Sequence, residues 1–331
     1  MLPAKVHDIP SAAAPQARGD GGAAPCQFVG SHDHVSGVRA SFALDTGMLG
    51  VAPPRLTFVT AGLIGLCAAP AAQAQDASAW DVETHAATRL IAGALIKSAD
   101  AAWLRAGVEI RLDPGWKTYW REPGDSGVPP TLDFSGSENV KSVTVLWPAP
   151  ERFPDGAGGH SIGYLTHVIL PLRVLPKDAA SPSSVHLKLA YAICANLCVP
   201  AEADLKLALT GDGAGESALV REELHVPRRV ALGAGKDLVV RSVHRVPGGE
   251  HERVEVEVAA PPGAPVDLFV EGPTPDWALP LPEPSGSDEA GTRHFTFQLE
   301  GMPPGAHAEG AMLTFTAVSG DDAIEAATHL D

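Results

Sequence analysis

The 331-residue sequence contains few cysteines, few aromatic residues and few basic residues. Aromatics make up 5%, and 24 Lys and Arg stand against 40 Asp and Glu, which gives a formal net charge of −16. Because non-specific nucleic-acid binding needs a basic face, this charge argues against a nucleic-acid partner. The 34 glycines and 30 prolines are more typical of short strands and turns than of long helices.

One apolar run lies near the N-terminus, from Leu56 to about Ala69. Arg55 precedes it, and the small-x-small pattern Ala72-Gln73-Ala74 follows it. This layout predicts a secretory signal peptide at residues 48–74. The run is shorter than the ~20 residues of a transmembrane helix, and no second long run follows. We therefore expect a soluble, exported protein that does not insert into the membrane after signal cleavage.

Residues 1–47 precede this signal and show no hydrophobic periodicity. Since a signal peptide stands at the N-terminus, we expect translation to begin at Met48 and residues 1–47 to be a spurious upstream extension or disordered. Removing both segments also removes Cys26 and Cys67. Cys194 and Cys198 then remain as the only cysteines, in an oxidising compartment.

The remaining chain divides into two β-rich regions, residues 75–212 and 235–331, joined by a helical connector at residues 213–234. Residues 104–112 alternate apolar and charged side chains, which predicts a half-buried strand with Arg105 and Glu109 on its polar face. Further strands are expected at residues 143–147, 166–174, 185–193 and 203–209, and a helix at residues 216–226.

The second region has five strand-like runs separated by Gly/Pro-rich turns, which is typical of a β-sandwich. They lie at residues 237–246, 253–260, 266–271, 294–300 and 312–319.

Cys194 and Cys198 occupy the turn between two predicted antiparallel strands. In an extended strand, residues four apart lie roughly 13 Å apart. A disulfide needs Cα atoms about 4.4–6.8 Å apart, so it requires a tight bend, for which Asn196 suits a left-handed conformation. As a structural staple, so short a loop would contribute roughly 2 kcal/mol.

Metal binding and redox exchange are the two other interpretations of the pair. Zinc usually takes four Cys or His ligands, whereas two thiolates alone can hold Cu(I). An exposed dithiol at a hairpin tip can instead exchange with a partner's disulfide without any cofactor. The residues themselves leave all three interpretations open.

Three stretches resemble a known family: "DPGWKTYWREPGDSGVPPTLDFSGSENV" at residues 113–140, "LWPAPERF" at residues 146–153 and "YAICANLCVPAEADLKLAL" at residues 191–209. Together they resemble the N-terminal periplasmic domain of DsbD-type thiol–disulfide reductases, and within that group the suppressor-of-copper-sensitivity B branch. The resemblance implies an immunoglobulin-like β-sandwich with a cysteine pair at one edge, followed here by a second β-sandwich-like domain.

The resemblance also implies that Cys194 and Cys198 are the redox-active residues, with Pro200 and Glu202 supporting them. We take Cys194 as the sulfur that forms the mixed disulfide. The family's best-known members differ in two ways: they have five residues between the cysteines and an acidic-aromatic cap loop over them. Here Ile162 or Tyr164, in the corresponding segment, is the candidate shield.

The resemblance implies that the protein would be a periplasmic electron relay and a component of a protein-disulfide reductase system. It would accept electrons from a membrane-embedded thiol–disulfide reductase and pass them to periplasmic thioredoxin-like proteins, without a cofactor or metal. No stretch of this sequence resembles the family's membrane or thioredoxin-like domains, so we expect other proteins to supply these steps. The alternative is a periplasmic binding module whose cysteines form a structural disulfide or bind Cu(I).

Overall fold

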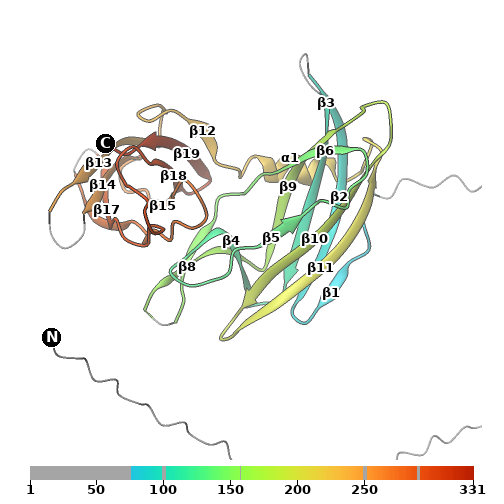
Figure 1. The fold of residues 1–331 in the computed structure, drawn as a ribbon, viewed down its shortest axis with the longest axis horizontal. Helices are drawn as coiled ribbons and strands as arrows, with labels where there is room; N and C mark the ends of the chain where they lie inside the picture. Colours follow the sequence, from blue (N-terminus) through green and yellow to red (C-terminus); the bar gives the residue numbers. More distant parts are fainter. Residues whose placement is uncertain (1–75, 99–101, 157, 249–251, 289–290) are drawn as a thin grey trace, which may run out of the picture. The chain divides into compact units, whose positions relative to one another are not determined.

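The computed structural model describes residues 76–98, 102–156, 158–248, 252–288 and 291–331. The predicted signal peptide and upstream extension lie outside the described residues. Within these ranges the chain forms β-strands and one short α-helix (Figure 1). The predicted all-β fold class is therefore confirmed.

The first β-rich region is an immunoglobulin-like sandwich of two antiparallel sheets. The first sheet has strand order β1-β2-β3-β9-β6, and the second has β11-β10-β4-β8-β7 with β5 paired to β10. The strands of the first sheet are β1 (Asp81–Glu83), β2 (Ala86–Lys97), β3 (Ala102–Leu112), β9 (His167–Pro176) and β6 (Val140–Val145). Those of the second are β11 (Cys198–Leu209), β10 (Ser183–Cys194), β4 (Lys117–Gly124), β8 (His160–Leu165), β7 (Glu151–Pro154) and β5 (Thr131–Asp133).

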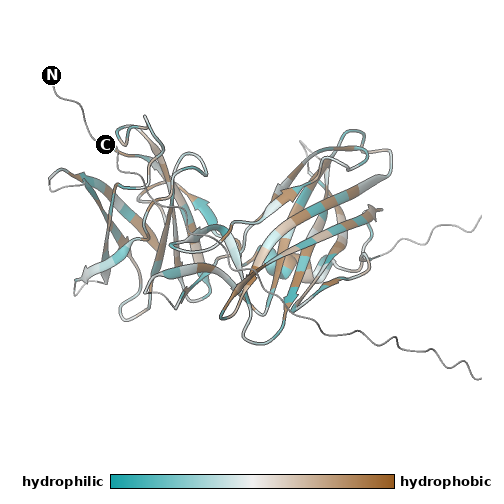
Figure 2. Cartoon of the chain, turned by 60° about the horizontal axis from the view of Figure 1, so that its bottom comes forward, coloured by the Kyte–Doolittle hydropathy of each residue, from teal (hydrophilic) through white to brown (hydrophobic). Residues whose placement is uncertain are grey.

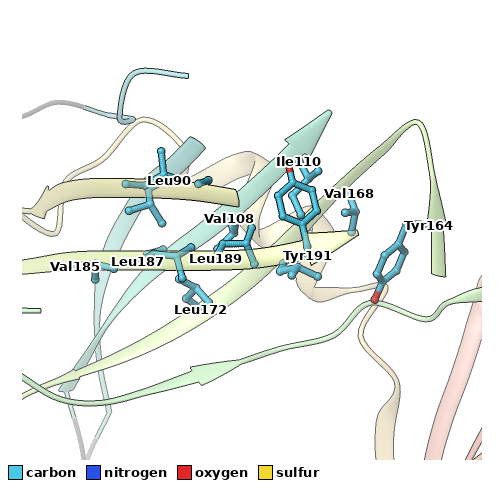
Figure 3. Packing of buried hydrophobic residues seen from close by; sticks show 14 of the residues in the cluster. Leu90, Val108, Ile110, Tyr164, Val168, Leu172, Val185, Leu187, Leu189 and Tyr191 are labelled. Carbon is cyan, nitrogen blue, oxygen red and sulfur yellow. The ribbon is translucent and has the colours of Figure 1, made fainter. Parts of the chain in front are cut away.

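Alternation along β10 builds one side of the core. Because successive side chains of a strand point to opposite faces, Val185, Leu187, Leu189 and Tyr191 all face the first sheet. Figure 3 shows these side chains against residues of β2, β3 and β9. The same alternation gives the strands their apolar and polar bands in Figure 2. The predicted strands at residues 143–147, 166–174, 185–193 and 203–209 correspond to β6, β9, β10 and β11.

Strand β3 is buried on both faces, contrary to the predicted half-buried strand. Arg105 and Glu109 are 9% and 2% exposed. Helix α1 (Glu216–Glu223) packs against this side of the first sheet, where Leu219 contacts Ile91 and Ile169. Buried charges need partners, and both residues have them. Arg105 pairs with Glu216 and Glu223 of the helix, while Glu109 bonds to side chains of β2, β3 and β9.

The predicted helix at residues 216–226 is thus present, ends at Glu223, and covers a sheet in addition to connecting two regions. The segment "GDGAG" before it brings the backbone of Gly213 and Gly215 against Ala92 of β2, where a Cβ would overlap the carbonyl. These glycines allow the chain to cross the sheet edge closely and to start the helix on its outer face.

Several strands had no clear sequence signal. Strands β2 ("AATRLIAGALIK") and β19 ("DAIEAATH", Asp322–His329) are rich in alanine, which is depleted in strands. Strands β4 and β8 contain proline or glycine and lack a long regular alternation. Tertiary pairing overrides these weak local preferences, because each of the four hydrogen-bonds to a neighbouring strand.

The second β-rich region consists of two four-stranded sheets, with orders β12-β19-β18-β15 and β13-β14-β17-β16. All five predicted strand runs are present, and β12 pairs in parallel with β19. The core between the sheets contains Val254, Val256, Phe297, Phe315 and Ile324. Besides β19, these two sheets contain β12 (Arg228–Val230), β18 (Met312–Ser319), β15 (Asp267–Glu271), β13 (Val239–Val246), β14 (Arg253–Ala259), β17 (Thr292–Gln298) and β16 (Glu283–Ser287).

Candidate functional site

The two cysteines face each other across a hairpin. Cys194 ends β10, Cys198 begins β11, and the two are Cα partners in a register that runs without a shift to Leu209. The loop between them has three residues, and the Ala195 N–H donates to the Leu197 carbonyl at 3.4 Å. The predicted tight bend is present, but Asn196 does not adopt a left-handed backbone: among the described non-glycine residues, positive φ occurs only at His85, Asn139 and Thr166.

The register also shows which kind of pair the cysteines form. The Asp204 N–H donates to Asp81 Oδ2 at 3.1 Å, so it points away from β10. Along a β-strand, the direction in which the backbone N–H points repeats every second residue. The N–H of Cys198 therefore points away from β10 as well. Cys194 and Cys198 form a non-hydrogen-bonded antiparallel pair, for which Cα atoms lie roughly 4.5 Å apart. This separation lies within the range that a disulfide bridges.

The same alternation of N–H directions explains how Pro200 fits in β11. Pro200 pairs with Ala192, and its nitrogen points to the free edge of the sheet, where the missing N–H costs no ladder bond. Glu202 is exposed farther along the strand and lines a hollow of ≈ 580 Å³ together with Asp133 and Asp204. Pro200 therefore lies beside the thiols in the next non-hydrogen-bonded pair, whereas Glu202 is one further such pair away.

The two thiols are free and differ in exposure. Cys194 is buried and Cys198 is exposed, next to Leu197, whose relative exposure is 73%. Disulfide exchange requires an attacking thiolate to reach one sulfur directly. Cys198 is the accessible sulfur in this conformation, which argues against the sequence-based choice of Cys194 for the mixed disulfide.

Tyr119 of β4 places a polar group directly against the exposed thiol. Its hydroxyl oxygen lies 3.0 Å from Cys198 Sγ, and its ring is buried with Ala192 and Cys194. Gly127 lies so close to this ring that a Cβ there would overlap it. Burial, together with the two thiols, raises the pKa of Tyr119 far above its ordinary value, so the hydroxyl keeps its proton and can donate to a thiolate.

Burial also determines the acidity of Cys194. It raises the pKa of the Cys194 thiol above its ordinary value, and the Cys198 thiol adds to this effect. The Tyr119 hydroxyl and the Lys117 ammonium act in the opposite direction. Neither Tyr119 nor Lys117 was among the site residues predicted from the sequence. Their spacing of two within "GWKTYW" places them on one face of a strand, a signal that could have identified them.

Ile162 and Tyr164 lie on β8 and point into the core between the sheets. The Tyr164 hydroxyl donates to the Pro148 carbonyl at 2.9 Å, and Figure 3 shows the ring at the end of the core cluster. Cys194 packs on the opposite face of the second sheet, with Tyr119. The structure thus separates the two candidate shields from the thiols, and a different segment, the turn at Gly127, lies against the Tyr119 ring.

Within the described ranges, no group of three or more His, Cys, Asp or Glu side chains is placed to hold a metal ion. No helix in the described part of the chain is long and apolar enough to cross a membrane.

Comparison with known proteins gives a family for the region that contains the cysteine hairpin. Residues 93–210 match the family described as "Thiol:disulfide interchange protein DsbD, N-terminal", which confirms the resemblance found in the sequence. The crystal structure of the N-terminal periplasmic domain of ScsB from Proteus mirabilis is similar in fold. Its TM-score is 0.60 at 21% identity, over 77% of this chain and 98% of that one. A search of curated proteins finds no match.

Proposed function

We propose, from the premise that residues 93–210 are a thiol–disulfide interchange domain of the DsbD N-terminal type, that this protein is a periplasmic electron relay. It accepts two electrons from a membrane-embedded thiol–disulfide reductase and passes them to periplasmic thioredoxin-like proteins. The similar ScsB domain is described as periplasmic, which supports this compartment.

One observation carries the proposal: an exposed sulfur is directly opposed to a buried one at a hairpin tip. In the reducing step, a partner thiolate attacks Cys198 Sγ and forms a mixed disulfide. The Cys194–Cys198 bond breaks, and its electron pair goes to Cys194 Sγ. A second partner thiol then displaces Cys198, which leaves a partner disulfide and the Cys194–Cys198 dithiol. The dithiol passes the same two electrons and two protons onward by the reverse sequence.

The hairpin is a poor place for a purely structural bond. By chain entropy, closing about five residues contributes roughly 2 kcal/mol, whereas a bond closing about 100 residues contributes roughly 4.7 kcal/mol. Moreover, β10 and β11 are already joined by twelve consecutive residue pairs. A disulfide at the tip therefore adds little order to the folded state, while it leaves one sulfur open to exchange.

Equilibration with glutathione redox buffers tests the proposal. We expect the thiol fraction, measured by alkylation and mass shift, to give a potential of roughly −120 to −270 mV, the range of thiol–disulfide oxidoreductases. A potential below about −300 mV would identify a structural disulfide instead.

Single-cysteine variants test the roles of the two sulfurs. Cys194→Ser should trap a mixed disulfide with a thioredoxin-like partner through Cys198. The matched variant Cys198→Ser should trap far less, because Cys194 is buried. Equal trapping by both variants, or stronger trapping by Cys198→Ser, would contradict the assignment of Cys198 as the exchanging sulfur.

A further inference from the structure

Lys117 lies beside the buried cysteine. Cys194 is the Cα partner of Cys198 on one side and of Lys117 of β4 on the other. Directly opposed residues of antiparallel strands place their Cβ atoms on the same face, about 4.5–5.5 Å apart. The three side chains Cys198, Cys194 and Lys117 therefore form a row across three strands, with Cys194 in the middle.

The Lys117 ammonium is buried and held in place. Lys117 is 8% exposed, its Nζ donates to the Pro154 carbonyl at 3.3 Å, and Nζ lies 4.6 Å from the centroid of the Phe153 ring. Both contacts are with neutral groups. They hold the side chain in place, and no carboxylate in the described part of the chain forms a salt bridge with it. Burying a charge costs free energy unless an anion compensates it.

We propose that Lys117 is a positioning residue for the exchange reaction, whose ammonium stabilises the thiolate that forms on Cys194 when the Cys194–Cys198 bond opens. The inference rests on the proposed function, because it is in this step that the buried sulfur becomes charged. When the partner thiolate bonds to Cys198 Sγ, the electron pair of the broken bond stays on Cys194 Sγ. No proton has to reach the buried sulfur at that moment.

The surroundings of Cys194 disfavour a negative charge on its sulfur, and a nearby cation would offset this effect. Burial raises the pKa of this thiol, and the neighbouring thiol of Cys198 adds to the rise, so its charged form is disfavoured. The groups that act against this are the Tyr119 hydroxyl and the Lys117 ammonium. Of these, the ammonium alone carries a full charge. A thiol with a lower pKa leaves faster in thiol–disulfide exchange, so Lys117 should speed the opening of the disulfide.

The decisive experiment titrates Cys194 alone, in the Cys198→Ser protein. The rate of its alkylation by a small reagent is measured against pH by mass spectrometry. Adding Lys117→Met should raise the pKa of Cys194 by at least about one unit, a roughly tenfold loss of thiolate at a given pH. Lys117→Arg should restore the parent value because it keeps the charge. Lys188→Met, on the exposed face of β10, removes the same charge away from the thiol row and is the matched control.

An unchanged titration in Lys117→Met, or an equal shift in Lys188→Met, would overturn the proposal. If Lys117→Met does not fold, Lys117→Gln provides the same test, since its amide can still donate to the Pro154 carbonyl. In the two-cysteine protein, Lys117→Met should also slow reduction of the disulfide by dithiothreitol several-fold, and an unchanged rate would count against the proposal. The proposed relay function has its own test. It would be contradicted if the disulfide of the unmodified protein resisted reduction by glutathione.

Discussion

At the scale of single residues, the two thiols of the hairpin have different neighbours. Cys198 is exposed and touches the Tyr119 hydroxyl, whereas Cys194 is buried between Cys198 and Lys117. A donor that bonds to a thiolate stabilises the reduced protein relative to the disulfide, because the disulfide carries no charge to accept the bond. The reduction potential of the pair should therefore depend on this hydroxyl.

Tyr119→Phe tests this dependence. We expect the potential to become more negative by roughly 10–30 mV, which corresponds to losing one hydrogen bond of about 0.5–1.5 kcal/mol. Glutathione equilibration measures the change. Tyr191→Phe is the matched control, since its hydroxyl bonds to Thr88 Oγ1 at 3.0 Å in the core. A shift of the same size in both variants would show that the effect is not specific to the thiols.

At the scale of elements, helix α1 stabilises the first sheet from outside. Leu219 is fully buried against Ile91 and Ile169. It also lies so close to Gly107 of β3 that a Cβ at that position would overlap the leucine side chain. The helix has eight residues, too few to be stable alone, so its order depends on this packing. The cysteine hairpin belongs to the other sheet.

Leu219→Ala should therefore destabilise the protein without changing its redox chemistry. Removing a fully buried leucine side chain costs about 2–5 kcal/mol, measured as a lower denaturant midpoint. Val220→Ala, at a half-exposed neighbouring position, should cost far less. The reduction potential of Leu219→Ala should equal that of the parent, and a changed potential would mean that the helix influences the thiols.

At the scale of the whole molecule, a buried carboxylate makes stability depend on pH. Glu109 of β3 contacts Arg89 of β2 at 2.7 Å, Arg111 at 2.7 Å and His167 of β9 at 3.1 Å. Burial favours its neutral form, but hydrogen bonds from these three side chains outweigh burial and hold the pKa of Glu109 below its ordinary value of 4.5. The ionised form therefore ties three strands together.

A lowered pKa in the folded state stabilises the protein above the unfolded pKa, and this stability is lost as pH falls through the folded value. We expect Glu109→Gln to be less stable than the parent by roughly 1–3 kcal/mol at pH 7. The difference should shrink below about pH 4. Denaturant titrations at pH 7, 5 and 3 measure it. Glu255→Gln, which breaks an exposed pair with Arg253, should cost below about 1 kcal/mol. A constant deficit for Glu109→Gln at all three pH values would contradict the linkage.

Local patterns in the sequence determined the all-β class, most of the long strands and the cysteine hairpin. The alternation in β10 and β11 is sufficient to place Cys194 and Cys198 at a turn, because a period of two and a three-residue loop are properties of neighbouring residues. The motif around Trp116 and Trp120 predicted the family, and the match of residues 93–210 to that family confirms the prediction.

Tertiary structure alone decided which groups surround the thiols. Tyr119 meets Cys198 from 79 positions away in the sequence, and Lys117 becomes the neighbour of Cys194 only because β4 pairs with β10. Likewise, Arg105 and Glu109 follow a solvent-facing pattern, yet they are buried because a helix and other strands supply their partners. Alternation determines which side of a strand a residue faces, whereas what covers that side depends on contacts between distant segments.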